Sequence, residues 1–130
     1  MMTNFDLKQS ALFTINAKTL YSTDILHVKK GEQYQFYCDK DQGWKDWFIP
    51  TGPNGYFNVL AWLIGLRLKS AKCFCLCGVY DQKDSTAFAI GSNNIIQMEK
   101  TGVVSFFAND TKGFYRNNSG CIKLRITRLQ

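Results

Sequence analysis

One segment near the end of the chain gathers side chains that could bind a metal ion. Within residues 109–120 lie the carboxylate of Asp110 and the side-chain amides of Asn117 and Asn118. Gly113 lets the backbone turn, which would bring main-chain carbonyl groups towards the same point. Calcium takes about six to eight oxygen ligands at about 2.3–2.6 Å and accepts carboxylate, amide and carbonyl oxygens together. This set of groups therefore favours Ca²⁺ over zinc or copper.

The same segment also fits a purely structural role. Asn, Asp, Gly and Ser are common in tight connections because they tolerate turn geometry. A plain hairpin connection between strands at residues 103–108 and 121–129 would use the same residue types. A tight calcium site usually has more than one carboxylate, and this segment has only Asp110. Composition therefore leaves both interpretations open.

The elements that must position this segment are predicted to be strands. Short stretches rich in Phe, Tyr, Val and Ile recur between clusters of Gly, Asn and Asp. In residues 121–129, Ile122, Leu124 and Ile126 alternate with polar residues, which predicts one buried and one exposed face. The same alternation in residues 33–38 predicts a second half-buried strand. Further strands are predicted at residues 12–15, 25–28, 74–76, 87–90, 95–98 and 103–108.

The region between residues 44 and 72 does not follow this pattern. It begins as a long connection with two prolines and continues into residues 59–68, which are apolar on nearly every side. Periodicity cannot distinguish a short helix from a buried strand in such a run. The 130 residues suffice for one hydrophobic core. We therefore predict an all-β chain folded as a single small, jelly-roll-like β-sandwich that spans residues 1–130.

The charge balance of the chain is mildly basic. Its formal net charge is +6 and its sequence pI is about 9.1. The lysines and arginines are dispersed rather than gathered in blocks, so we expect a solvated surface and no nucleic-acid partner. The longest apolar run, residues 59–66, is far shorter than the roughly 20 residues that span a bilayer. No membrane insertion is expected.

The cysteines and the histidine suggest packing rather than catalysis. Cys73, Cys75 and Cys77 are predicted to share one face of a strand, as buried thiols rather than a zinc or redox site. His27 is the only histidine, and no nucleophile motif accompanies it. We expect no enzyme. The first eight residues lack the pattern of a signal peptide, and five cysteines favour a reducing compartment. A cytoplasmic protein, or one exported without a recognisable signal, is expected.

The motif Asn109-Asp110-x-x-Gly113-x-Tyr115-x-Asn117-Asn118-Ser119-Gly120 resembles the calcium- and sugar-binding loop of the bacterial galactophilic, calcium-dependent lectins, the PA-IL-like family. Upstream, Lys30-Gly31-Glu32, Gly43-Trp44 and Gly52-Pro53-Asn54-Gly55 follow in the order of that family's segments. The resemblance implies a β-sandwich of the galactose-binding type that binds one Ca²⁺, shared between the protein and two sugar hydroxyls.

The resemblance also implies roles for particular residues. Side-chain oxygens of Asp110, Asn117 and Asn118, and main-chain carbonyl oxygens of Phe114 and Trp47, would bind the metal. The residues expected to contact the sugar are Asp110, Thr111, Phe114 and Asn117. Trp62, where the sequence departs from the family, would either stack on the apolar face of a pyranose or belong to the core. The family's galactose-reading His and Gln correspond to about Val59 and Trp62 here, and neither residue can make the same hydrogen bonds.

Two functions are therefore expected from the sequence. The first is a Ca²⁺-dependent lectin that binds a galactoside or related glycan, and homo-oligomers are expected because they are common in the family. The second is a calcium-stabilised sandwich that has lost sugar binding and serves in protein interaction or assembly. Exposure of the apolar residues 59–68 would favour the second function.

Overall fold

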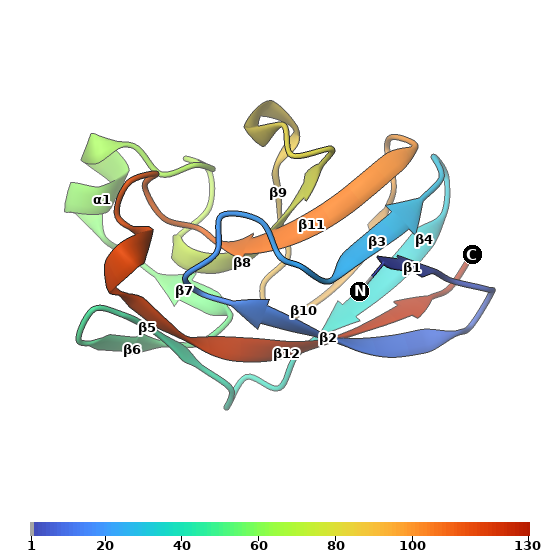
Figure 1. Cartoon of the computed structure of the whole chain (residues 1–130), viewed down its shortest axis with the longest axis horizontal. Coiled ribbons are helices and arrows are strands. Elements are labelled where there is room, and N and C mark those ends of the chain that lie inside the picture. The colour runs from blue at the N-terminus through green and yellow to red at the C-terminus, as the bar shows by residue number, and fades with distance from the viewer. Residues whose placement is uncertain (1) are drawn as a thin grey trace.

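The computed structural model of the chain describes the backbone of residues 2–130 and the side chains of residues 5–130. Two β-sheets pack face to face (Figure 1). In the first sheet the strand order is β1 (Met2–Asn4), β3 (Ile25–Val28), β11 (Gly102–Ala108), β8 (Cys73–Tyr80) and β7 (Asn54–Tyr56), with β9 (Phe88–Ala89) beside β8. The predicted all-β sandwich is confirmed.

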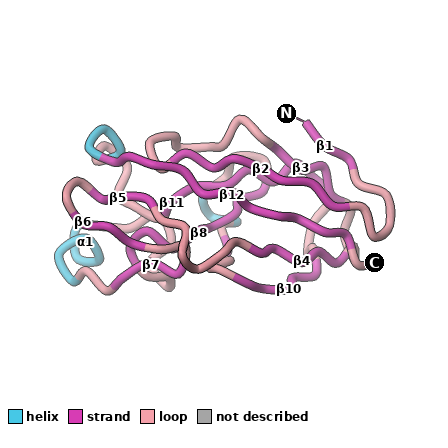
Figure 2. Tube along the Cα trace, turned by 90° about the horizontal axis from the view of Figure 1, so that it is seen from below, coloured by secondary structure: helices cyan, strands magenta, loops and turns pink. Residues whose placement is uncertain are grey.

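The second sheet is built around the longest strand of the chain. Its order is β10 (Asn93–Gln97), β4 (Gln33–Tyr37), β12 (Asn118–Arg128), β5 (Trp44–Asp46) and β6 (Ile49–Thr51), with β2 (Ser10–Asn16) also on β12. The helical elements are α1 (Val59–Ile64) and the 3₁₀ turns η1 (Asp84–Thr86) and η2 (Tyr115–Asn117). Figure 2 shows how the strands of the two layers run along the long axis of the molecule.

The core lies between the two sheets, where alternating apolar residues meet. Ile122, Leu124 and Ile126 of β12 are fully buried, as their alternation predicts. Phe36 of β4 and Phe106 of β11 come from opposite sheets, and their ring centroids lie 6.0 Å apart. Burial of each such side chain stabilises the fold by about 1.5–3 kcal/mol. The predicted strands at residues 12–15, 25–28, 33–38, 95–98 and 103–108 correspond to β2, β3, β4, β10 and β11.

The ambiguous apolar run forms the short helix α1. The Asn58 side chain caps it by accepting a hydrogen bond from the Ala61 N–H at 3.1 Å. Gly65, with φ at +126°, ends it and donates its N–H to the Ala61 carbonyl. None of the six helical residues is buried. No helix in the described part of the chain is long and apolar enough to cross a membrane.

Strand β8 contains a local irregularity that separates its cysteines. Phe74 has φ at +65°, so the alternation of side chains is interrupted there. Cys73 therefore joins the main core, whereas Cys75 and Cys77 pack in a second apolar cluster with Phe107. The prediction that all three cysteines share one face is wrong. Their predicted burial is confirmed.

Strands β11 and β12 lie in different sheets, so residues 109–117 connect the two layers. The plain hairpin interpretation of this segment is wrong, because β11 pairs with β3 and β8 while β12 pairs with β2, β4 and β5. The first residues of β12 pair with β5, and Gly120 lies opposite Trp44. A Cβ atom on Gly120, whose φ is +89°, would lie 3.0 Å from the Trp44 Cα. Glycine therefore permits this close pairing.

We expect Gly120→Ala to lower the free energy of unfolding by about 1–3 kcal/mol. The added methyl group would meet backbone atoms, and the left-handed φ disfavours a side chain. Gly31→Ala is the control, because its φ of +94° is similar and no atom lies within 4 Å of the added Cβ. Urea denaturation measures both variants. Equal destabilisation of the Gly120→Ala and Gly31→Ala variants would show that the close approach of Gly120 to the Trp44 backbone does not require glycine.

Candidate functional site

A cavity of about 360 Å³ lies at one end of the sandwich, among three segments. These segments are the β5–β6 hairpin, α1 with the residues that precede it, and the connection from β11 to β12, which Figure 1 shows at the same end of the molecule. The cavity has acidic, amide and apolar side chains in its wall. Its lining residues are Asp46, Trp47, Ile49, Asn58, Leu60, Ala61, Ile64, Asp110, Thr111, Phe114 and Asn117.

Asn109 anchors the segment that follows α1 to the end of β11. Its side-chain oxygen accepts a hydrogen bond from the Leu68 N–H at 3.0 Å. Its side-chain amide donates to the carbonyl oxygens of Leu68, Ala71 and Lys72 at 2.8–3.2 Å. The side chain is fully buried. This one buried amide, which accepts one hydrogen bond and shares its two hydrogens among three carbonyl oxygens, fixes residues 68–72 against the end of β11.

Arg67 holds the connection between the two sheets from beneath. Its guanidinium donates to the Tyr115 hydroxyl at 3.0 Å, and that hydroxyl donates to the Ala108 carbonyl. It also pairs with the Asp84 carboxylate at 3.0 Å and lies 3.6 Å from the centroid of the Phe107 ring. The pKa of Asp84 is lowered despite partial burial, because Arg67 and further hydrogen bonds stabilise its charged form. This network positions η2 next to the cavity.

Asp110 is a nearly buried carboxylate, with 5% of its surface exposed. One of its oxygens accepts the Thr111 N–H at 2.7 Å, and the other accepts the Asn118 side-chain amide at 3.0 Å. Burial raises the pKa of Asp110 to about 6, and the negative charge of Asp46 adds to this shift, whereas the two hydrogen bonds lower the pKa. A nearby cation would therefore stabilise the ionised form.

Asp46 is a second carboxylate in the same cavity, and the sequence analysis missed it. It directly precedes Trp47, and the pairing of β5 with β12 places it opposite Asn118. Its Oδ2 accepts a hydrogen bond from the Tyr56 hydroxyl. The Asn58 amide donates to the same hydroxyl at 3.2 Å while its oxygen caps α1. The helix cap and the carboxylate are therefore parts of one hydrogen-bonded chain.

Asn118 does not line the cavity, but it bonds to Asp110, which does, and it leaves one acceptor unused. Only 1% of its surface is exposed. Its amide nitrogen donates to the Ala17 carbonyl and to Asp110, both at 3.0 Å. Its Oδ1 is buried and has no hydrogen-bond partner among the described residues. Such an unpaired acceptor costs about 1–3 kcal/mol, and a bound cation would satisfy it.

The structure brings most of the predicted site residues together. Trp47, Asp110, Thr111, Phe114 and Asn117 line the cavity. The backbone of Trp47 has φ at +57°, and its N–H donates to the Asn117 carbonyl at 3.2 Å. The hairpin tip is therefore tied directly to η2.

Trp62 is not in the cavity wall. It lies on α1 with 44% of its surface exposed, and the Lys69 ammonium lies 5.3 Å from the centroid of its ring. Val59 does not line the cavity either. The helix instead presents Asn58, Leu60 and Ala61 to the cavity, because neighbouring positions on a helix point in different directions.

The chemistry of the donor groups suits a hard cation. No group of three or more His, Cys, Asp or Glu side chains that could hold a metal ion occurs in the described part of the chain. A zinc site would use such a group. The ligands here would be two carboxylates, Asp46 and Asp110, with amide and carbonyl oxygens, and calcium accepts this mixture. The orphaned Asn118 oxygen and the desolvated Asp110 carboxylate both fit a cation at this place.

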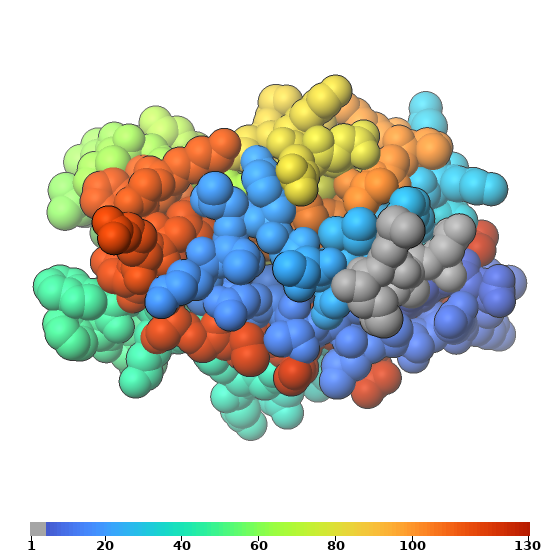
Figure 3. All heavy atoms as spheres, viewed as in Figure 1, coloured from blue at the N-terminus to red at the C-terminus, as the bar shows by residue number. Residues whose placement is uncertain are grey.

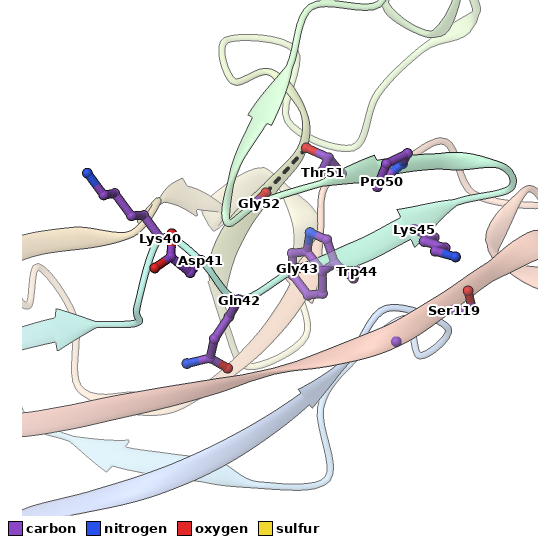
Figure 4. Close-up of a pocket in the computed structure, with 11 residues that line it drawn as sticks. Lys40, Asp41, Gln42, Gly43, Trp44, Lys45, Pro50, Thr51, Gly52 and Ser119 are labelled. Atoms are coloured by element: carbon purple, nitrogen blue, oxygen red, sulfur yellow. Dashed lines mark hydrogen bonds between the residues drawn. The ribbon is translucent and has the colours of Figure 1, made fainter.

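A larger hollow of about 520 Å³ lies beside β5. Figure 4 shows residues 40–45 and 50–52 around it, with the Lys40 side chain extending away from Trp44. Asp41, which is exposed, is the one acidic residue among its lining residues. This hollow therefore lacks the two carboxylates that distinguish the cavity at Asp110.

The fold and the cavity define a small β-sandwich domain with an acidic site at one end, formed where the two sheets are connected. The chain is similar to a solved structure described as "EclA N-terminal domain; PllA-like lectin". The sequences are 17% identical, the match covers 90% of this chain and 94% of that chain, and the TM-score is 0.66. The expected lectin resemblance is thereby confirmed at the level of the fold. No protein-family model matches the chain, and no curated protein is similar to it in sequence.

We expect the stability of the metal-free protein to fall as pH rises through about 6. Because the pKa of Asp110 is raised in the folded state from 3.8 to about 6, the stability linked to its protonated form is fully present below about pH 3.8 and lost above pH 6. Asp110→Asn removes this loss. The substitution also places an amide NH2 where one carboxylate oxygen accepts an N–H, and this cost does not depend on pH. In chelator, the stability of the variant relative to the wild type should therefore rise by up to about 3 kcal/mol between pH 4 and pH 7.

Urea unfolding at pH 4, 5.5 and 7 measures this effect, with Asp41→Asn as an exposed control. A stability difference between Asp110→Asn and the wild type that stays the same from pH 4 to pH 7 in chelator would show that the carboxylate is well accommodated without a cation.

Proposed function

We propose that the chain binds one Ca²⁺ ion in the cavity at Asp110 and, through this ion, the vicinal hydroxyls of a saccharide. The observation that carries the proposal is the pairing of a desolvated carboxylate with an unpartnered amide oxygen, at Asp110 and Asn118, beside a second carboxylate at Asp46. The fold neighbour's description as a lectin supports sugar as the ligand.

The metal ligands follow from the groups at the cavity. Asp110, Asn117 and Asn118 would bind through side-chain oxygens, and Phe114 and Trp47 through main-chain carbonyl oxygens. Asp46 is a further carboxylate that the sequence analysis did not include. When bound, Ca²⁺ would neutralise the two carboxylates and offer positions that sugar hydroxyls can take from water.

The rest of the wall suits one face of a pyranose ring. Ile49, Leu60 and Phe114 provide apolar surface, whereas Thr111 and Asn58 provide hydrogen-bonding groups. Small-molecule sites commonly combine an apolar wall with a few placed polar groups. Galactosides are the first ligands to test. The wall lacks counterparts of the His and Gln through which the PA-IL-like lectins read galactose, so a different sugar preference is compatible with the proposal.

A binding role is favoured over catalysis. Each oxygen of Asp110 already accepts a hydrogen bond from an N–H group, and Asp46 accepts one from Tyr56. Carboxylates whose oxygens are held in this way would serve as fixed acceptors and metal ligands more readily than as groups that exchange protons with a substrate.

We expect Ca²⁺ to raise the melting temperature of the wild-type protein relative to chelator. Binding to the folded state alone stabilises it by about 2.7 kcal/mol when the free ion is at a hundred times its Kd. Asp110→Ala should abolish the shift, and Asp41→Ala should retain it. Differential scanning fluorimetry at pH 7 provides the measurement. An unchanged melting temperature of the wild type in millimolar Ca²⁺ would contradict the proposal.

A glycan array in Ca²⁺ separates the two functions expected from the sequence. Binding of galactosides or related sugars that disappears in chelator, and in Asp110→Ala, supports the lectin. Calcium stabilisation with no bound glycan, together with a stable oligomer in light scattering, would support the assembly module. The exposed apolar face of α1 is the observation that favours this second function.

A further inference from the structure

The tip of the β5–β6 hairpin presents two aromatic rings to solvent. Asp46 pairs with Ile49, so the connection consists of Trp47 and Phe48. Hairpin connections of two residues ordinarily carry Gly, Asn or Asp, and Gly is usual where φ is positive at the first position. Here that position is Trp47, with φ at +57°. The two rings stack with centroids 4.6 Å apart, and both are exposed. This connection is therefore apolar and exposed, whereas two-residue hairpin connections are ordinarily polar.

This hairpin tip belongs to a larger apolar face, which we call the apolar end. It comprises residues 47–49, residues 57–64 and Phe114. Ten large apolar side chains in these segments keep 44–78% of their surface exposed, out of fifteen such side chains in residues 5–130. Summed over all sides of these segments, their exposed surface is on the order of 1,000 Å², against roughly 300–600 Å² for the largest contiguous patch on a typical monomer. Figure 3 shows the segments together at one end.

Cationic side chains accompany the apolar end. Residues 44–72 and 109–119 contain five exposed lysines and arginines, and their two carboxylates, Asp46 and Asp110, line the cavity instead. Lys112, which also pairs with Asp84, and Arg116 flank Phe114 in sequence. Lys69 lies over the ring of Trp62. Lys69, Lys112 and Arg116 therefore place positive charge beside the apolar end, while Asp46 and Asp110 lie in the cavity.

We propose that the apolar end binds the surface of an anionic lipid bilayer. Exposed aromatic and aliphatic side chains bordered by lysine and arginine are typical of surfaces that lie in the headgroup region, where apolar groups enter the acyl boundary and cations meet lipid phosphates. The residues come from three separate segments. Their contact with the lipid surface is therefore distinct from a membrane-spanning insertion, for which the apolar run at residues 59–66 is too short. A self-complementary contact between two copies is disfavoured, because it would bring the same positive borders together.

The orientation has a consequence for the proposed sugar site. The cavity opens among the three segments of the apolar end, so a bilayer bound there would place the cavity at the height of the lipid headgroups. The lipid contact itself requires neither calcium nor sugar. It can therefore be tested separately from the proposed function.

The test is sedimentation of the full chain with vesicles that lack any glycolipid, in the presence of chelator. We expect binding to vesicles of phosphatidylcholine and phosphatidylserine, weaker binding to phosphatidylcholine alone, and weakening by salt. Phe48→Ser/Leu63→Ser should reduce the partition coefficient about tenfold. Neither of these residues lines the cavity. The control is Tyr37→Ser/Ile95→Ser, which changes two exposed apolar residues outside the apolar end.

Circular dichroism and thermal melting check that each variant folds. Two results would overturn the proposal. One is equal sedimentation of the wild type and the Phe48→Ser/Leu63→Ser variant. The other is absence of vesicle binding together with a wild-type dimer that this variant dissociates in light scattering, which would assign the apolar end to a second copy of the chain. Loss of calcium stabilisation alone would bear on the sugar site and leave this proposal standing.

Discussion

The hydrogen bond between the Asn118 amide and the Asp110 carboxylate joins the two sheets at the end that holds the cavity. Asp110 follows β11 in one sheet, and Asn118 begins β12 in the other. Because both side chains are almost completely buried, this contact takes a charge out of water at the place where the layers are connected. Other side chains hold the backbone in this region. The Asn109 amide, the Arg67 guanidinium and the Tyr115 hydroxyl each donate a hydrogen bond to a backbone carbonyl oxygen.

Burial of a carboxylate without a positive partner is unfavourable, and the cavity would therefore favour a bound cation. Asp84 shares a buried network with Arg67, and its pKa is lowered. Asp110 has no such cation and faces a second carboxylate, so its pKa is raised. The two acids belong to the same connected region of the fold, yet their environments shift their pKa values in opposite directions. A divalent cation would offset the negative charges of Asp110 and Asp46, as the Arg67 guanidinium offsets that of Asp84.

Much of the fold could be predicted from the sequence because its strongest signals are local. Alternation in β4 and β12 identified both strands and their buried faces. The three-residue strands β5, β6 and β7 were missed, since they are too short for a period and contain Pro50 and Gly55. The run that forms α1 is apolar on nearly every side and so carries no period. The shift of Cys73 to the main core depends on one backbone angle, at Phe74, which composition does not reveal.

The candidate site could be predicted where its residues are consecutive. Asp110, Thr111, Phe114 and Asn117 lie within one segment and line one cavity. Asp46 could not be found in the same way, because it reaches the cavity through the non-local pairing of β5 with β12. Trp47 came from the family resemblance, and its neighbour Asp46 carries no motif of its own. Trp62 was expected to face the ligand, but the direction of a side chain on a six-residue helix depends on packing that sequence spacing does not determine.

Calorimetric titration of the metal-free protein with CaCl₂ at pH 7 measures whether the cavity at Asp110 binds a divalent cation. We expect saturable binding of one Ca²⁺ per chain, with release of only about a tenth of a proton at pH 7, because Asp110 with a pKa of about 6 is already mostly ionised there. We also expect the Asp46→Asn/Asp110→Asn variant, if folded, to give no such binding. A wild-type protein that produces only heats of dilution, or a double variant that binds Ca²⁺ as the wild type does, would contradict the proposed calcium site.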